Sequence, residues 1–191
     1  MKFKFIFLTF LFLTTSVHAA AAPSILHWNL SSTTVPKYDL FEVEVILQSA
    51  VHNPYNYDSI TLTATFVAPS GQTKVIEGFF FQNFVSLNNG LLEPQGTPFW
   101  KLRFTPNETG IWHFSIKVED VFGVDSVNNL SFQCVQSSSG GFLHLPQGTN
   151  YFKNEAGKTV FLVGENIAWA NQADGSDRMS YFLDQLSQHQ M

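Results

Sequence analysis

Paired carboxylates are the first residues to consider for chemistry in this 191-residue chain. Two carboxyl groups a few ångströms apart can cleave a glycosidic bond. Glu42 and Glu44 lie two residues apart in an extended run, which puts them on one strand face about 6.7 Å apart. The run alternates apolar and acidic residues, so this face is predicted to be solvated, with no burial to raise either pKa. We therefore predict no catalytic pair in the chain.

Other reactive groups form no motif. The six histidines include no pair at the spacing of a zinc site, so no metal site is predicted. The chain has no glycine-rich phosphate loop, and no cofactor is expected. With 10 basic and 15 acidic residues, the net charge of −5 argues against nucleic acid as a partner. Cys134 alternates with Phe132 and is predicted to be a small buried hydrophobe; a nucleophile or a disulfide to a partner chain is the alternative.

Residues 1–22 have the pattern of a secretory signal peptide. Lys2 and Lys4 precede a nine-residue apolar run, and small residues follow, so cleavage after Ala19 or Ala22 is expected. Nine residues fall far short of the roughly 20 that cross a bilayer, so no membrane span is expected after cleavage. The protein is therefore predicted to be secreted, periplasmic or on the cell surface. Because Cys134 is the single cysteine, the exported chain must be stabilised by its core.

Apolar residues recur with period two from about residue 24 to residue 137, and turn residues separate the runs. The predicted strands cover residues 25–30, 41–47, 60–66, 75–81, 99–104, 112–118 and 130–135. Seven short strands in this length are typical of two packed antiparallel sheets. We therefore expect a β-sandwich over residues 23–137, with Trp28, Trp100 and Trp112 in its core.

The pattern changes after the Ser/Gly-rich residues 137–141. Three short strands are predicted at residues 142–145, 151–153 and 159–164, and the last is apolar on both faces, as in a parallel sheet buried on both sides. Met179, Phe182, Leu183 and Leu186 then follow a helical period. We expect residues 138–191 to be a linker, a β-hairpin and the first β-α unit of an incomplete (β/α)8 barrel. The alternative is a complete small protein whose helix packs on the sandwich.

Two resemblances support this organisation. The segment 106–114 resembles the turn and penultimate strand of immunoglobulin-like domains, with Trp112 or Phe114 where tyrosine is usual, so a tyrosine hydroxyl bond is absent. The ordered set of segments resembles an uncharacterised immunoglobulin-like module that precedes the barrel in cellulase-like glycoside hydrolases. Its matching residues are Trp28, Val35, Tyr38, Glu42, 53–55, 66–71, 78–80, 100–106, 110–112, 139–143, 151–152 and 161–169.

The second resemblance implies a function. Such enzymes use two carboxylates on later barrel strands, which this chain does not contain, so the chain alone is predicted to be inactive. Glu165, Asn166 and Trp169 follow the first predicted barrel strand and become candidates for sugar contact. The alternatives are core or interface packing for Trp169 and a structural hydrogen bond or ion pair for Glu165.

The expected partners are therefore a polysaccharide or oligosaccharide and the missing C-terminal barrel of the same polypeptide. A self-sufficient immunoglobulin-like module that binds glycan or protein at the cell surface is the second hypothesis. The sequence does not decide between the two hypotheses. An exposed row of aromatic rings would favour sugar stacking, but the sequence alone does not show which of four rings are exposed: Phe79, Phe80, Phe81 and Phe84.

Overall fold

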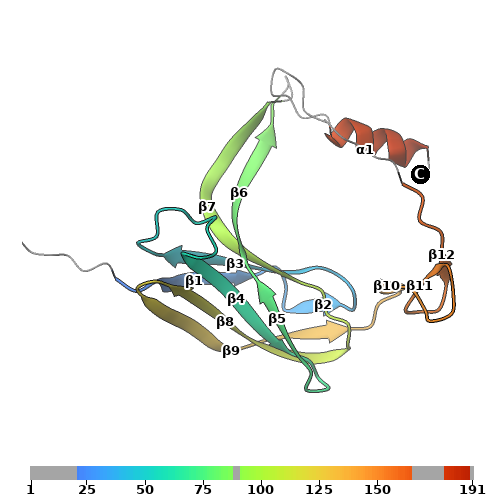
Figure 1. The fold of residues 1–191 in the computed structure, drawn as a ribbon, viewed down its shortest axis with the longest axis horizontal. Helices are drawn as coiled ribbons and strands as arrows, with labels where there is room; N and C mark the ends of the chain where they lie inside the picture. Colours follow the sequence, from blue (N-terminus) through green and yellow to red (C-terminus); the bar gives the residue numbers. More distant parts are fainter. Residues whose placement is uncertain (1–20, 88–90, 165–178, 190–191) are drawn as a thin grey trace, which may run out of the picture.

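The computed structural model describes residues 21–87, 91–164 and 179–189, and the chain is mainly β (Figure 1). Three sheets and one helix make up the described part. The strands are β1 Ser24–Leu30, β2 Thr34–Pro36, β3 Phe41–Gln48, β4 Ile60–Val67, β5 Thr73–Glu77, β6 Phe79–Ser86, β7 Leu92–Phe104, β8 Gly110–Asp120, β9 Gly123–Val135, β10 Leu143–His144, β11 Phe152–Asn154 and β12 Thr159–Val160.

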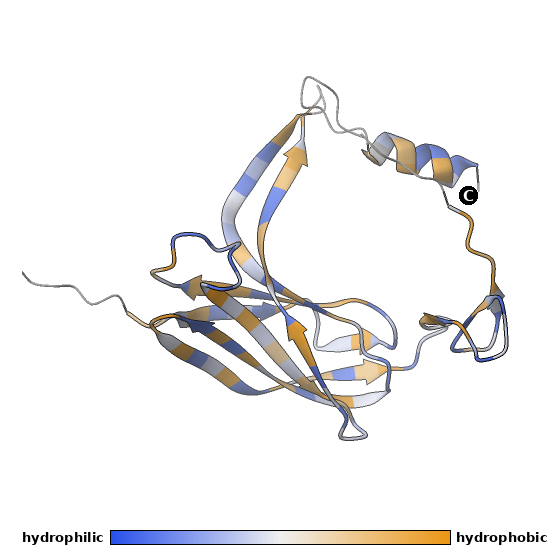
Figure 2. Cartoon of the chain, viewed as in Figure 1, coloured by the Kyte–Doolittle hydropathy of each residue, from blue (hydrophilic) through white to orange (hydrophobic). Residues whose placement is uncertain are grey.

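Two sheets form the body of the molecule and share one core. The four-stranded sheet has the order β1-β3-β7-β6, and the five-stranded sheet has the order β2-β9-β8-β4-β5. Alternate residues of β3, β4 and β8 are buried, as the period of two predicts, and Figure 2 shows the same alternation as stripes along the strands. The core therefore forms between the inward faces of both sheets.

Aromatic rings fill the centre of this core. Phe66 stacks on Phe104 with ring centroids 4.0 Å apart, and Phe41 stacks on Phe132 at 4.2 Å. These rings come from both sheets, so they join the two layers. Trp100 and Trp112 are buried and Trp28 packs against the core, which confirms the prediction for the three tryptophans.

One predicted strand is wrong. Residues 75–81 are not a single strand, because the chain leaves the five-stranded sheet after β5 and enters the four-stranded sheet with β6. The backbone N–H of Gly78 still donates to the Leu62 carbonyl at 2.7 Å, whereas Phe79 already pairs with Lys101 of β7. A β-carbon on Gly78 would lie 2.7 Å from the Leu62 side chain, so the crossing requires a residue without one.

A second difference concerns residues 34–36, which lie outside the predicted strands. They form β2, which pairs in parallel with β9, whereas the other strand pairs of the described residues are antiparallel. Val35 is buried opposite Cys134. Pro36 is the last residue of this short edge strand, a position where proline is tolerated. The expectation of a wholly antiparallel sandwich was therefore wrong at this edge.

The third sheet, β10-β11-β12, is small and antiparallel. The strand predicted for residues 159–164 is shorter than expected, because only Thr159 and Val160 pair with β11. Phe161, Leu162 and Val163 continue beyond it with exposed side chains. Figure 2 colours this stretch as hydrophobic.

The predicted helix is confirmed as α1, Met179–Gln188. Within the described part of the chain, no helix has the length and apolar character needed to cross a membrane.

Candidate functional site

Charged and aromatic side chains gather on the outer face of the four-stranded sheet. Antiparallel register places Glu42 of β3 opposite Arg103 of β7 and Phe79 of β6 opposite Lys101 of β7. Alternation along β7 sends Trp100 and Leu102 into the core, so Lys101 and Arg103 point outward. We call this set the ionic–aromatic cluster; its members are Glu42, Phe79, Phe81, Phe99, Lys101 and Arg103.

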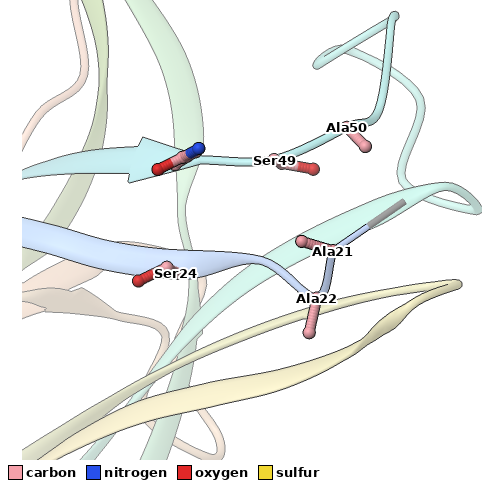
Figure 3. Close-up of a pocket in the computed structure, with 6 residues that line it drawn as sticks. Ala21, Ala22, Ser24, Ser49 and Ala50 are labelled. Carbon is pink, nitrogen blue, oxygen red and sulfur yellow. The ribbon is translucent and has the colours of Figure 1, made fainter. Parts of the chain in front are cut away.

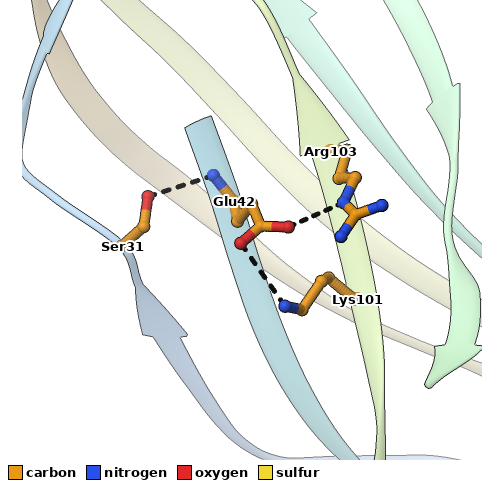
Figure 4. Close-up of polar contacts among 4 residues, drawn as sticks. All are labelled: Ser31, Glu42, Lys101 and Arg103. Carbon is orange, nitrogen blue, oxygen red and sulfur yellow. Dashed lines mark hydrogen bonds and ion pairs between the residues drawn. The ribbon is translucent and has the colours of Figure 1, made fainter. Parts of the chain in front are cut away.

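Glu42 links the two cations of the cluster (Figure 4). One carboxylate oxygen accepts a hydrogen bond from Nε of Arg103 at 2.6 Å, and the other lies 3.3 Å from Nζ of Lys101. The backbone N–H of Glu42 donates to the Ser31 hydroxyl at 3.0 Å, which fixes the start of β3. The carboxylate is therefore held between two positive charges.

The phenyl rings surround these cations. Nζ of Lys101 lies 4.4 Å from the ring centroid of Phe81 and 5.6 Å from that of Phe99. The guanidinium of Arg103 lies 5.1 Å from the centroid of Phe79. Because of this cover, Lys101 is only 7% exposed although it faces away from the core.

The environment of Glu42 lowers its pKa. Partial burial acts to raise the pKa, but the hydrogen bonds and charges of Arg103 and Lys101 together outweigh burial. Glu42 thus stays ionised, whereas a general acid needs a raised pKa. The prediction that Glu42 is no catalytic acid fits this environment, although the residue is paired rather than merely solvated.

Replacing Glu42 by glutamine is expected to lower the stability at pH 7 by about 1 kcal/mol. Because the folded-state pKa lies below the ordinary 4.5, this contribution is present above pH 4.5 and is lost as the pH falls through the folded pKa. Chemical unfolding between pH 3 and pH 7 should show wild type and Glu42→Gln converging towards acid pH. Glu44→Gln is the matched control, since Glu44 is exposed and makes no ion pair within the described residues. Parallel stability curves for wild type and Glu42→Gln would contradict the assignment.

The outer face of the five-stranded sheet is polar instead. Two adjoining depressions of about 460 and 520 Å³ lie over β4, β8 and β9, and both are lined by Thr65, Ser115 and Asn128. A β-bulge in β9 brings Asn129 there with a φ of 61°. These groups can form hydrogen bonds, but the lining side chains that face outward include no Phe, Tyr or Trp ring.

A smaller depression of about 310 Å³ lies where the chain enters β1 (Figure 3). Ala21, Ala22 and Ser24 line one side, and Ser49 and Ala50 line the other. The Ser49 hydroxyl donates to Asp120, whose other oxygen accepts from the turn N–H groups of Phe122 and Gly123. Asp120 therefore holds the turn between β8 and β9. Cleavage after Ala22 would remove two of the lining residues.

The sequence-predicted sugar contacts Glu165, Asn166 and Trp169 lie outside the described residues.

Cys134 is free and 1% exposed, which confirms the prediction of a small buried hydrophobe, and burial raises the pKa of its thiol. Among the described residues, no group of three or more His, Cys, Asp or Glu side chains could hold a metal ion. The cations Lys101 and Arg103 were missed as site residues, because only the register of β3 and β7 brings them to Glu42.

Comparisons with known proteins cover part of the chain. Residues 34–119, which contain the whole ionic–aromatic cluster, match the family model of a domain of unknown function (DUF5060). The search of curated proteins gave no match. Among solved structures, the chain is similar to a candidate glycoside hydrolase from Bacteroides vulgatus, with a TM-score of 0.47 and 22% sequence identity. The match covers 68% of this chain and 22% of that one, so the chain spans about a fifth of the length of the structure it resembles.

Proposed function

We propose that this chain is the N-terminal accessory portion of an exported glycoside hydrolase-like protein that acts on polysaccharide. Residues 1–22 are the signal peptide, residues 23–137 an immunoglobulin-like sandwich, and residues 138–191 a linker, a hairpin and the start of a (β/α)8 barrel. The catalytic carboxylates belong to later parts of the polypeptide, and the sandwich supports the barrel or binds carbohydrate.

The exposed apolar run Phe161-Leu162-Val163 carries this proposal. Its side chains are 83%, 61% and 72% exposed, and they directly follow β12. Consecutive large apolar residues pointing to both sides suit a strand that is covered on both faces, as the first strand of a barrel is. An exposed apolar run of this kind is typical of a surface that another part of a protein covers.

The contact between the small sheet and the body supports a structural role. The Tyr38 ring meets Phe142 edge to face with centroids 5.5 Å apart, and its hydroxyl hydrogen-bonds the Glu155 carboxylate. Gly141, with a φ of 81°, passes so close to Tyr38 that a β-carbon would lie 2.8 Å from the ring. These contacts hold the small sheet against the body, so that the polypeptide leaves β12 from a defined place.

The Trp112 indole supports the immunoglobulin-like part. Its Nε1–H donates to the carbonyl of Glu108, four residues earlier, at 2.9 Å. A tyrosine hydroxyl makes a comparable bond to the upstream backbone in a tyrosine corner. The hydrogen bond expected to be absent is thus replaced by one from the indole.

Two measurements test the proposal. Purified residues 20–191 should release no reducing sugar from a polysaccharide panel; hydrolysis that Glu165→Gln abolishes would overturn the proposal. The reading frame should also continue beyond the Met191 codon through alternating strands and helices. In that longer protein, amide hydrogens of residues 161–163 should exchange at least tenfold more slowly than in residues 20–191, because they become strand-paired. A stop codon after Met191, or equal exchange in both proteins, would contradict it.

The ionic–aromatic cluster favours a second function, that of a self-sufficient module binding glycan or protein at the cell surface. Half-buried rings beside fixed charges are common in recognition surfaces. This function predicts binding by residues 20–191 alone, with exchange at residues 161–163 unaffected by any additional C-terminal sequence.

A further inference from the structure

We infer that the ionic–aromatic cluster binds an oligosaccharide that carries a carboxylate or sulfate group. Arg103 contacts the anion, and the rings of Phe79, Phe81 and Phe99 contact the sugar. The inference rests on the carbohydrate-binding form of the proposed function and adds the site and the ligand class.

Arg103 is arranged to receive an anion. Its Nε–H is committed to Glu42, and its guanidinium lies against the Phe79 ring. The two terminal nitrogens make no hydrogen bond within the described part of the chain, and the side chain is 49% exposed. A guanidinium whose plane is already fixed can bind carboxylate or sulfate through two parallel hydrogen bonds with little loss of conformational freedom.

The charge balance favours an anion at the Arg103 end of the cluster. Glu42 is shared between two cations, so the three groups together carry one positive charge. Glu44 is the other carboxylate of this strand face, but register places it opposite Lys101 rather than Arg103. A ligand anion beside Arg103 therefore meets the terminal nitrogens of the guanidinium near an apolar surface, where attraction is stronger than in open water.

The rings provide the second part of the site. Phe79 and Phe81 meet edge to face at 6.1 Å, and Phe81 and Phe99 do so at 5.4 Å. All three are half-buried, so part of each ring still faces solvent. The C–H faces of a sugar pack on such apolar surface, while Lys101 beneath holds Phe81 in position.

Titration calorimetry with residues 20–191 tests the inference with four ligands: an oligogalacturonate, a sulfated oligosaccharide, a neutral cello-oligosaccharide of equal length, and inorganic sulfate. We expect at least one charged oligosaccharide to bind tenfold or more tightly than both the neutral one and sulfate. Arg103→Ala should weaken that binding at least tenfold. Arg103→Lys should weaken it severalfold, because it keeps the charge but loses the planar fork. Lys117→Ala is the matched control, since Lys117 lies on the opposite sheet in an ion pair with Glu119.

The remaining outcomes overturn the inference. Equal binding of the neutral oligosaccharide would keep carbohydrate binding but remove the anion. Equal binding of sulfate alone would leave only an ion site. If no charged oligosaccharide binds, or if the two Arg103 variants bind like wild type while folded by circular dichroism, this site is wrong. None of these results alters the hydrolysis and hydrogen-exchange tests, so the accessory role stands or falls separately.

Discussion

Replacing Trp112 by alanine is expected to lower the free energy of unfolding by about 4 kcal/mol. The side chain is fully buried and stacks on Phe132, and its ring centroid lies 5.0 Å from that of Phe104. Phe104 belongs to the opposite sheet, so the cavity opens at the contact of both layers. Urea unfolding followed by circular dichroism measures the loss.

Two further variants separate the loss of the buried ring from the loss of its hydrogen bond and from the loss of an exposed ring. Trp112→Phe keeps most of the buried ring but removes the donor to the Glu108 carbonyl, and we expect a loss of about 1–2 kcal/mol. Phe84→Ala removes a ring that is 54% exposed on β6 and should cost less than about 1 kcal/mol. The ranking would be contradicted if Trp112→Ala cost no more than Phe84→Ala.

Replacing Gly78 by valine is expected to cost about 2–3 kcal/mol. The added β-carbon would lie 2.7 Å from Cδ2 of Leu62 and 3.1 Å from Cδ2 of Leu102. Both leucines are fully buried, one in each sheet, so neither can move aside without disturbing its layer. A fall in the urea midpoint at an unchanged m-value would show that stability, rather than the denatured state, has changed.

Gly164→Val is the matched control for this change. It adds the same atoms at a glycine whose β-carbon would meet nothing within 4 Å. We expect it to shift the stability of residues 20–191 by less than about 0.5 kcal/mol. Equal losses from both glycine variants would show that the cost lies in the residue type and not in the crossing between sheets.

The period of two was enough to predict the buried faces. Phe41, Val43 and Val45 of β3 and Trp112, Phe114 and Ile116 of β8 lie in the core, because each alternation is regular and bounded by turn residues. Sequence could not predict that residues 75–81 divide between two sheets, since both halves are extended and apolar. The sequence signal for the division was Gly78 alone, and one glycine within a strand pattern can mark a bulge, a bend or a close backbone approach.

The candidate site was harder to predict. Glu42 stood out as a carboxylate on a polar strand face, but its partners are about 60 residues away in sequence. Their meeting depends on the register between β3 and β7, which the core residues set and which no local pattern records. The rings of Phe79 and Phe81 were noticed as ambiguous, and their outward direction is fixed only once Phe80 is placed against Trp100.

The single-residue crossing at Gly78 affects how the molecule unfolds. β5 and β6 are consecutive strands but form the edges of different sheets, and a single residue connects them. Fraying of either edge therefore strains the other, and the two layers are expected to melt as one cooperative unit rather than in succession.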